Sequence, residues 1–405
     1  MNKEQEKQIE EVLTRGVEQV LPSTDELKKV LLSGKKIKLY CGFDPSAPAL
    51  HIGNAIALNK LSQFQKLGHK IIFLIGDFTG MIGDPTDKTA ARKKMTREEV
   101  LENAKDYVKQ ASCYLDFEGE NPAEIKYNSE WNDKLNFKDL IELASNFTVQ
   151  QMMQRDMFQE RIKSEQPIFL HEFFYPLTQA YDSVVLDVDL EVGGNDQMFN
   201  MLCGRDLMKA VKNKEKFVLM NKLIADDSGK KMGKSEGNVV FLNEGPTNMF
   251  GKIMAWPDGV LNVAFELCTK VPMERIAEIK ILLKDEKANP RDLKLELAFE
   301  ITKIVHGEGE AQKAKEYFVN TFSKREMPTE IAEFVVEDNA KILDYIVAVG
   351  FATSKGDARR KMEQNGVSLE NEGKLEIVIA DRNLDKDDDG KVLKVGKKDF
   401  VKIKF

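Results

Sequence analysis

The chain has 405 residues, a formal net charge of -7, and only four cysteines and four histidines. This length suffices for two or three domains with a large buried core. The net negative charge argues against bulk electrostatic binding of nucleic acid, so any RNA contact must come from local basic patches. The scattered cysteines favour a reduced cytoplasmic protein, and the few histidines form no zinc-ligand pattern with them.

The N-terminal segment does not match a targeting signal. Residues 1–7 are charged and precede no apolar segment, which argues against a secretory signal and a transit peptide. Runs of about 18 apolar residues are absent from the sequence, so no membrane span is expected.

Strand and helix patterns alternate through the first half of the chain, which predicts an α/β fold with a parallel sheet. Thr96 with Glu99 three residues later predicts a capped helix start. The predicted strands are Lys36–Gly42, Lys70–Gly76 and Val184–Val192, and the predicted helices are Ile52–Leu67, Thr96–Tyr107 and Thr148–Lys163.

The second half divides into a helical region and a small α/β module. Residues from about 245 to 322 show mostly helical patterns, and the charged, proline-containing segment 323–328 is typical of a linker. Domains are therefore predicted at 1–235, 236–328 and 338–405. Within the last, the predicted elements are a helix at Lys355–Gln364 capped by Ser354, and strands at Val378–Ile379 and Phe400–Phe405.

The stretch from Cys41 to Asn54 contains the first chemical motif. An apolar strand ends in Gly-Phe-Asp-Pro, and a short loop leads to His-Ile-Gly-Asn at a helix start. Gly53 lets a flat group such as adenine lie close to the backbone. His51 and Asn54 can face a bound phosphate and add donors to the free helix amides. For this four-residue match alone, a helix-capping histidine is the alternative interpretation.

A second motif, Lys-Lys-Met-Gly-Lys-Ser, begins at Lys230 after a Gly/Asp-rich turn. Lysines in a loop can stabilise the charge that develops as pyrophosphate leaves. The segment Gly229–Ser235 is one residue short of a Walker A loop and follows no apolar strand directly. A solvated lysine run on a surface turn is the other alternative.

These two motifs together resemble the His-Ile-Gly-His and Lys-Met-Ser-Lys-Ser signatures of class I aminoacyl-tRNA synthetases, in the order that this family requires. Asn54 replaces the second histidine and Gly233 the first serine. The segment Tyr175–Asp182 resembles the tyrosine-binding helix of tyrosyl-tRNA synthetases. Gly193–Gln197 and Gly83–Arg92 resemble further segments of that family, and the resemblance covers essentially the whole chain.

The resemblance implies an enzyme that activates tyrosine with ATP and transfers it to the 3′ end of tRNA(Tyr). It implies a Rossmann-like catalytic domain (1–235), a helical anticodon-binding domain (236–328) and an S4-like RNA-binding domain (338–405). It also implies Mg²⁺ accompanying ATP, with no metal held by the protein, and a homodimer with the helix around Gln150–Arg161 near its interface.

The implied site residues are mostly donors and cations. The tyrosine carboxylate is already a nucleophile, so alignment and charge stabilisation must supply the rate. The implied catalytic residues are His51, Asn54, Lys88, Arg92, Lys231 and Lys234. Tyr40 and Asp182 would bracket the tyrosine phenol, with Asp84, Tyr175 and Gln179 around its α-ammonium group. Gly42, Asp44, Gly53, Gly194, Asp196, Gln197 and Lys234 would bind ATP and the adenylate, and Lys355, Arg359 and Arg360 would bind RNA.

Two other functions remain as alternatives. A tryptophan–tRNA ligase would share the architecture, but an aspartate at 182 suits a hydroxyl donor. An inert relative that only binds RNA would have no use for His51, Asp84 or the lysine loop. The run Asp385–Gly390 also fits the first half of a calcium loop, but Gly396 stands where a bidentate glutamate is needed, so an acidic turn is predicted.

Overall fold

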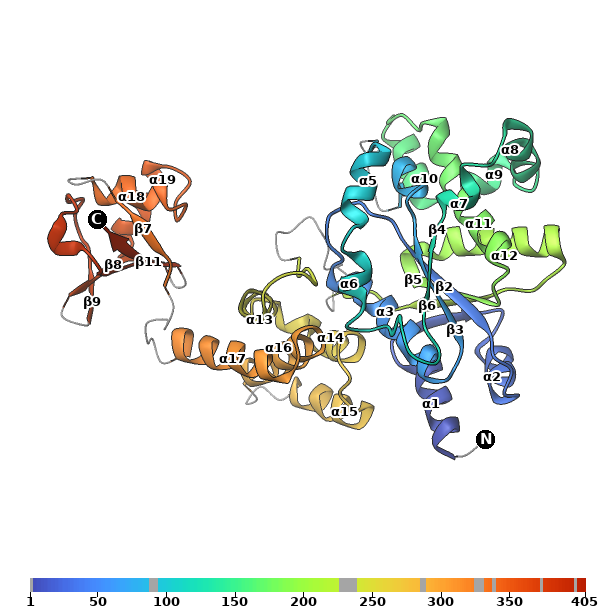
Figure 1. The fold of residues 1–405 in the computed structure, drawn as a ribbon, viewed down its shortest axis with the longest axis horizontal. Coiled ribbons are helices and arrows are strands. Elements are labelled where there is room, and N and C mark those ends of the chain that lie inside the picture. Colours follow the sequence, from blue (N-terminus) through green and yellow to red (C-terminus); the bar gives the residue numbers. More distant parts are fainter. Residues whose placement is uncertain are drawn as a thin grey trace. The chain divides into compact units, whose positions relative to one another are not determined.

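The computed structural model describes residues 3–86, 94–225, 239–284, 289–323, 331–336, 340–371, 374–396 and 399–405. The chain divides into two compact units, Met1–Ala311 and Gln312–Phe405 (Figure 1). The finer division at about 235 and 328 stays a prediction. Among the described residues, no helix combines the length and apolar character needed to cross a membrane.

A six-stranded sheet forms the centre of the first unit, with the strand order β1-β6-β5-β2-β3-β4. Strands β2 to β6 run parallel to one another, and β1 pairs antiparallel with β6. The predicted parallel α/β fold is therefore confirmed. The strands are β1 (Val17–Leu21), β2 (Lys38–Phe43), β3 (Lys70–Ile75), β4 (Glu124–Tyr127), β5 (Leu190–Gly194) and β6 (Phe217–Asn221).

From β2, strands β3 and β4 follow toward one edge of the sheet, whereas β5 and β6 lie toward the opposite edge. The boundary between β2 and β5 is thus a topological switch point. In open α/β sheets, ligands bind in the crevice outside the carboxyl ends of the strands at such a point. The helices around this sheet are α1 (Lys3–Thr14), α2 (Thr24–Leu32), α3 (Ile52–Lys66), α4 (Thr79–Ile82), α5 (Arg97–Ala104), α6 (Tyr107–Ala111), α7 (Ser129–Asn132), α8 (Phe137–Ala144), α9 (Val149–Met152), α10 (Asp156–Lys163), η1 (Leu170–Phe173), α11 (Phe174–Leu186), η2 (Asn195–Gln197) and α12 (Met198–Lys212).

Two element predictions in this region are wrong. The segment Val184–Val192 is not one strand, because α11 continues to Leu186 and β5 starts only at Leu190. Val184 extends the apolar helix face that packs against α12, and a short apolar run does not distinguish helix from strand. The predicted helix Thr148–Lys163 is interrupted, because Arg155 has an extended backbone between α9 and α10.

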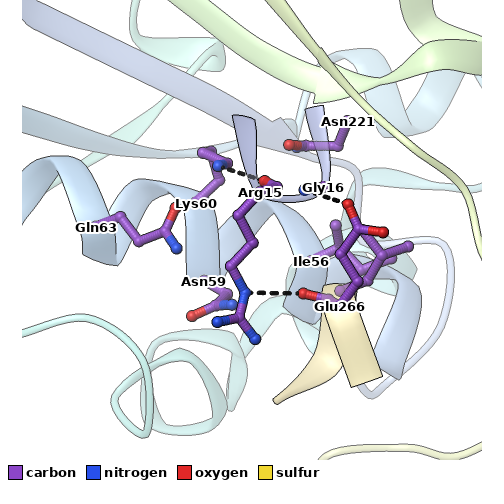
Figure 2. A pocket seen from close by; sticks show the side chains of 9 residues that line it. Arg15, Gly16, Ile56, Asn59, Lys60, Gln63, Asn221 and Glu266 are labelled. Carbon is purple, nitrogen blue, oxygen red and sulfur yellow. Dashed lines mark hydrogen bonds between the residues drawn. The ribbon is translucent and has the colours of Figure 1, made fainter. Parts of the chain in front are cut away.

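The helical region after the sheet packs against it through a buried polar junction (Figure 2). Lys60 of α3 donates to the carbonyl oxygens of Val12 and Arg15 at 2.7 and 2.8 Å, at the end of α1. The Arg15 guanidinium donates to carbonyls at the end of α14, including Thr269 at 2.6 Å. These bonds satisfy helix-end carbonyls and fix α3, whose first residue follows His51. The helices of this region are α13 (Pro246–Met254), η4 (Asp258–Val260), α14 (Leu261–Cys268), α15 (Met273–Leu282) and α16 (Pro290–His306). The boundary between the two units falls within α17 (Glu308–Phe318), and the π-helical η5 (Val319–Ser323) belongs to the second unit.

The second unit is a small α+β fold with its own apolar core, which fits the predicted S4-like domain. Its sheet has the order β7-β11-β10-β8-β9. The predicted strand Val378–Ile379 is wrong, because β9 ends one residue earlier. The elements are β7 (Glu333–Val335), α18 (Ile342–Ala348), α19 (Lys355–Glu363), β8 (Val367–Asn371), β9 (Lys374–Ile377), η6 (Lys386–Asp388), β10 (Val392–Val395) and β11 (Asp399–Lys404).

Candidate active site

Polar residues gather where β2, β3 and β5 end. Asp44 follows β2, Thr79 begins α4 after β3, and Asp196 lies in η2 directly after β5. Asp44 Oδ1 accepts from Thr79 Oγ1 at 2.6 Å, so the ends of β2 and β3 are joined. Gly76 makes this approach possible, because a Cβ there would lie 2.0 Å from Asp44 Oδ1. The candidate site therefore occupies the crevice position that the strand order predicts.

Helix α11 supplies one wall of this site. Tyr175, Gln179 and Asp182 are spaced at i, i+4 and i+7, which places them on one face of the helix. Tyr175 donates from its hydroxyl group to Asp44 Oδ2 at 2.8 Å, which ties α11 to the end of β2. The sequence motif therefore forms a continuous polar face across the crevice.

Asp182 is buried, with 1% of its surface exposed, and accepts three hydrogen bonds. Oδ1 accepts from Trp131 Nε1 at 2.7 Å and from Asn132 Nδ2 at 3.2 Å, and Oδ2 accepts from Asn128 Nδ2 at 3.2 Å. A carboxylate offers about four acceptor positions, so one remains on Oδ2. Burial raises the pKa of Asp182 well above its usual range, and the three donors oppose that rise.

Tyr40 of β2 lies beside Asp182. Its hydroxyl group is 2.9 Å from Ser183 Oγ, and the side chain is 1% exposed. Burial raises the pKa of Tyr40 well above its usual range, and the carboxylates of Glu191 and Asp182 add to the rise. The phenol therefore stays protonated and can both donate and accept a hydrogen bond.

Asp84 forms a second polar group with Gln197. Its Oδ2 accepts from Gln197 Nε2 at 2.7 Å, and its Oδ1 accepts from Thr86 Oγ1 at 2.7 Å. The Arg155 guanidinium lies 3.4 Å from Oδ1 and is itself buried between aromatic rings. Burial lowers the pKa of Arg155, and Asp84 opposes that shift. The hydrogen bond between Asp84 and Gln197 links the segment after β3 with the turn after β5.

The His-Ile-Gly-Asn motif begins α3 with a capping box. His51 Nδ1 accepts from the Asn54 backbone amide at 3.3 Å, and Asn54 Oδ1 accepts from the His51 amide at 3.0 Å. Because Nδ1 accepts, a neutral imidazole carries its proton on Nε2. Asn54 Nδ2 has no acceptor among the described residues. Gly53 accommodates the imidazole, since a Cβ there would lie 2.9 Å from His51 Cε1.

The remaining predicted residues fall into three groups. Lys88, Arg92, Lys231 and Lys234 lie outside the described residues. Gly42 lies within β2 and Gly194 ends β5, beside Asp196. In the second unit, Lys355 and Arg360 pair with Asp344 and Asp357, whereas Arg359 has no partner among the residues that the structure describes.

Several residues of the site were not predicted from the sequence. They make buried polar contacts with the predicted residues or, in the case of Lys216, with the partners Ser183 and Glu191 of those residues, and no local motif marks them. Asn128 illustrates the point, because its amide bridges Thr79 and Asp182 from a segment about fifty residues away. The only signal in the sequence that could have suggested them is their polar character within otherwise apolar segments. They are Thr79, Asn128, Trp131, Asn132, Arg155, Ser183, Glu191 and Lys216.

Comparisons with known proteins agree with this geometry. The family model described as tRNA synthetases class I (W and Y) matches residues 32–323. The tyrosine–tRNA ligase of Thermotoga maritima is 42% identical over 97% of this chain and 96% of its own length. Tyrosine–tRNA ligase 2 of Vibrio cholerae is 43% identical over 96% of this chain and 97% of its own.

The solved structures share the fold. A C-terminally truncated mitochondrial tyrosyl-tRNA synthetase from Coccidioides posadasii has a TM-score of 0.61 and 24% identity, over 78% of this chain and 94% of that one. The Archaeoglobus fulgidus tyrosyl-tRNA synthetase complexed with L-tyrosine has a TM-score of 0.58 and 21% identity, over 76% and 99%. The chain therefore belongs to the class I tRNA synthetases, and within them to the tyrosyl-tRNA synthetase family.

Proposed function

We propose that this site catalyses the two steps of tyrosine–tRNA ligation, with the residues in the following roles. Asp182 accepts a hydrogen bond from the phenol group of the tyrosine substrate at the remaining position on Oδ2. The Tyr40 hydroxyl group contacts the phenol oxygen of the substrate. The three donors already on Asp182 support this role, because they fix the carboxylate in place. This preorganised, nearly saturated carboxylate is the observation that carries the proposal.

The opposite end of tyrosine meets the second polar group. Asp84, Tyr175 and Gln179 bind the α-ammonium group, and Gln197, Asp196 and Gly194 line the adenylate. Asp84 and Gln197 are joined at 2.7 Å, so a ligand that contacts one is held near the other. The tyrosine carboxylate then attacks the α-phosphorus of ATP, and pyrophosphate leaves.

Charge on the phosphates is met by donors rather than by a general base. His51 Nε2 and Asn54 Nδ2 are donors at the start of α3, where the helix amides add positive potential. Positively charged side chains stabilise the transition state, and we assign this role to Lys88, Arg92, Lys231 and Lys234. Mg²⁺ arrives on the phosphate oxygens of ATP, as part of the nucleotide substrate. The second unit binds tRNA through Lys355, Arg359 and Arg360, and the reaction takes place in the cytoplasm.

Homodimerisation is supported by exposed apolar side chains on one segment of the first unit. Phe137, Ile141, Val149 and Leu170 are 79%, 55%, 70% and 72% exposed. Such a concentration of large apolar side chains marks an interaction surface. We expect Leu170→Asp to shift the protein toward a monomer in sedimentation, whereas Ile379→Asp at a similarly exposed site of the second unit leaves the dimer intact. A monomeric parent protein would contradict the proposal.

The substrate assignment is tested by ATP–pyrophosphate exchange with each standard amino acid. Tyrosine alone should support exchange, and the exchange should stop in the Lys231→Ala/Lys234→Ala variant while equilibrium binding of tyrosine persists. Exchange with tryptophan would favour the neighbouring branch of the family. RNA binding without any exchange would show an inert relative.

A further inference from the structure

A buried ion pair lies behind the proposed tyrosine-binding residues. Glu191 of β5 and Lys216, which precedes β6, are in direct contact, and their side chains are 3% and 0% exposed. Removing two charges from water costs several kcal/mol per ion, so such a pair is stable only when further hydrogen bonds satisfy both groups. The hydrogen bonds of this pair therefore indicate its role.

Both charged groups bond to residues on the functional face of α11. Glu191 Oε1 accepts from Gln179 Nε2 at 3.0 Å, and Glu191 Oε2 lies 3.4 Å from Ser183 Oγ. Lys216 Nζ donates to Ser183 Oγ at 2.9 Å. Ser183 Oγ in turn lies 2.9 Å from the Tyr40 hydroxyl group. Two residues proposed to touch tyrosine are thus held by the same ion pair.

A glycine on α12 leaves the space for this arrangement. A Cβ at Gly204 would lie 2.4 Å from Lys216 Nζ, 2.9 Å from Ser183 Oγ and 3.3 Å from Glu191 Oε2. A glycine inside a helix costs about 1 kcal/mol relative to alanine. The small residue is therefore matched to the buried lysine.

The bond to Glu191 determines which end of the Gln179 amide faces the crevice. A carboxylate only accepts hydrogen bonds, so the Gln179 NH₂ group must point toward Glu191. The Gln179 carbonyl oxygen then turns the other way. A carbonyl oxygen is the group that an α-ammonium requires, since an ammonium only donates.

Lys216 also limits the cost of a second carboxylate near Asp182. Burial lowers the pKa of Lys216, and Glu191 opposes that shift. Glu191 raises the pKa of both Asp182 and Tyr40 through its charge. The ammonium group of Lys216, in direct contact with Glu191, compensates the charge of that carboxylate.

We propose that Glu191 and Lys216 are positioning residues for tyrosine recognition: Lys216 fixes the Glu191 carboxylate, and Glu191 orients the Gln179 amide so that its carbonyl oxygen meets the α-ammonium group. The inference rests on the proposed contact between Gln179 and tyrosine. Because both residues act through Gln179, their loss affects recognition of the ammonium group more than recognition of the phenol.

The sharpest variant is Glu191→Gln, which changes the volume of the side chain very little. Lys216 requires an acceptor, so the oxygen of the introduced amide faces Lys216 and its NH₂ group faces Gln179. Gln179 must then turn and present its own NH₂ group to the ammonium. We expect the tyrosine KM in ATP–pyrophosphate exchange to rise at least tenfold, with the ATP KM unchanged.

A tyrosine analogue without the ammonium group separates positioning from general damage. The inhibition constant of 3-(4-hydroxyphenyl)propionate should change less than threefold in Glu191→Gln. An equal loss for tyrosine and for this analogue would overturn the proposal, because a merely structural defect weakens both. Unchanged binding of both ligands would overturn it as well.

Lys216→Met provides the second test, with Lys60→Met as its matched control. Both replace a buried lysine of the first unit, but Lys60 bonds only to backbone carbonyls at the end of α1. We expect Lys216→Met, but not Lys60→Met, to weaken the binding of tyrosine more than the binding of the analogue. The same selective loss in Lys60→Met would refute the assignment.

Gln179→Ala distinguishes a failure of this inference from a failure of the proposed function. If Gln179→Ala weakens the binding of tyrosine more than that of the analogue and Glu191→Gln does not, the ion pair has no positioning role. In that case the proposed contact of Gln179 with tyrosine stands. If Gln179→Ala also lacks the selective loss, the proposed contact between Gln179 and the ammonium group is wrong.

Discussion

Replacing Asp182 by alanine tests the proposed recognition of the tyrosine phenol. The variant removes the acceptor position on Oδ2, and a hydrogen bond to a charged group contributes about 1.5–3 kcal/mol. The preference for tyrosine over phenylalanine, measured as a ratio of kcat/KM values, should therefore fall about 10- to 150-fold. The loss should come from tyrosine, because phenylalanine makes no use of the acceptor.

The effect on stability can be worked out from the three donors. Asn128 Nδ2 keeps its bond to Thr79, and Asn132 Nδ2 keeps its bond to the Asn128 carbonyl. Only Trp131 Nε1 loses its sole acceptor. One unsatisfied buried donor costs about 1–3 kcal/mol, so the unfolding free energy should fall by about that amount.

Asp182→Asn keeps the acceptor for Trp131 and removes the acceptor on Oδ2. Trp131 and Asn132 both donate to Oδ1, so the amide oxygen occupies that position and the NH₂ group replaces Oδ2. The introduced NH₂ group faces the Asn128 Nδ2 donor and lacks an acceptor, so the unfolding free energy should fall by about 1–3 kcal/mol. Selectivity should fall about tenfold because the charged acceptor is gone. Asp388→Asn, at a buried carboxylate of the second unit, is the control and should leave selectivity unchanged. Parental selectivity in Asp182→Ala would refute the assigned role.

Three further predictions concern other parts of the chain. Asn54→Asp keeps an acceptor for the His51 amide but loses the Nδ2 donor. Adenylate formation in rapid-quench assays should therefore slow more than in Asn54→His, while the melting temperature stays unchanged. Equal rates of adenylate formation in the two variants would show that Asn54 only caps the helix. Burial, with a smaller effect of Lys36, lowers the pKa of His69 to about 4. Its folded pKa is below the unfolded value, so stability is present above pH 6.5 and is lost as the pH falls toward 4; urea titrations should show a loss of about 2 kcal/mol between pH 7 and pH 5 that His69→Gln lacks. Deleting residues 331–405, which form the second sheet and its helices, should leave tyrosine-dependent pyrophosphate exchange intact and lower tRNA charging at least tenfold. A truncated enzyme that charges tRNA at the parental rate would contradict the RNA-binding role.

The sequence alone determined the features that depend on neighbouring residues. Thr96 and Glu99 form the capping box that their spacing predicts. The i, i+4, i+7 spacing of Tyr175, Gln179 and Asp182 predicts one helix face, and the structure has it. These outcomes follow because helix caps and helix faces are set by contacts within one or two turns.

Local patterns were ambiguous where tertiary packing decides. The apolar residues at Val184 fit a strand as well as a helix, and packing against α12 selected the helix. Arg155, whose backbone is extended, bonds to Asp84 seventy-one positions earlier in the chain, a contact that no helical pattern reveals. Secondary-structure boundaries therefore depended on contacts that the sequence does not display.

The network that supports the site was decided by tertiary structure alone. Trp131 meets Asp182 across fifty-one positions, and Lys216 meets Glu191 across twenty-five. A buried polar group must find a partner, but the sequence does not state which segment provides it. The strand order β6-β5-β2-β3 brings these segments together. The motifs thus identified the residues proposed to touch substrate, and only the packed sheet showed which buried residues hold them in place.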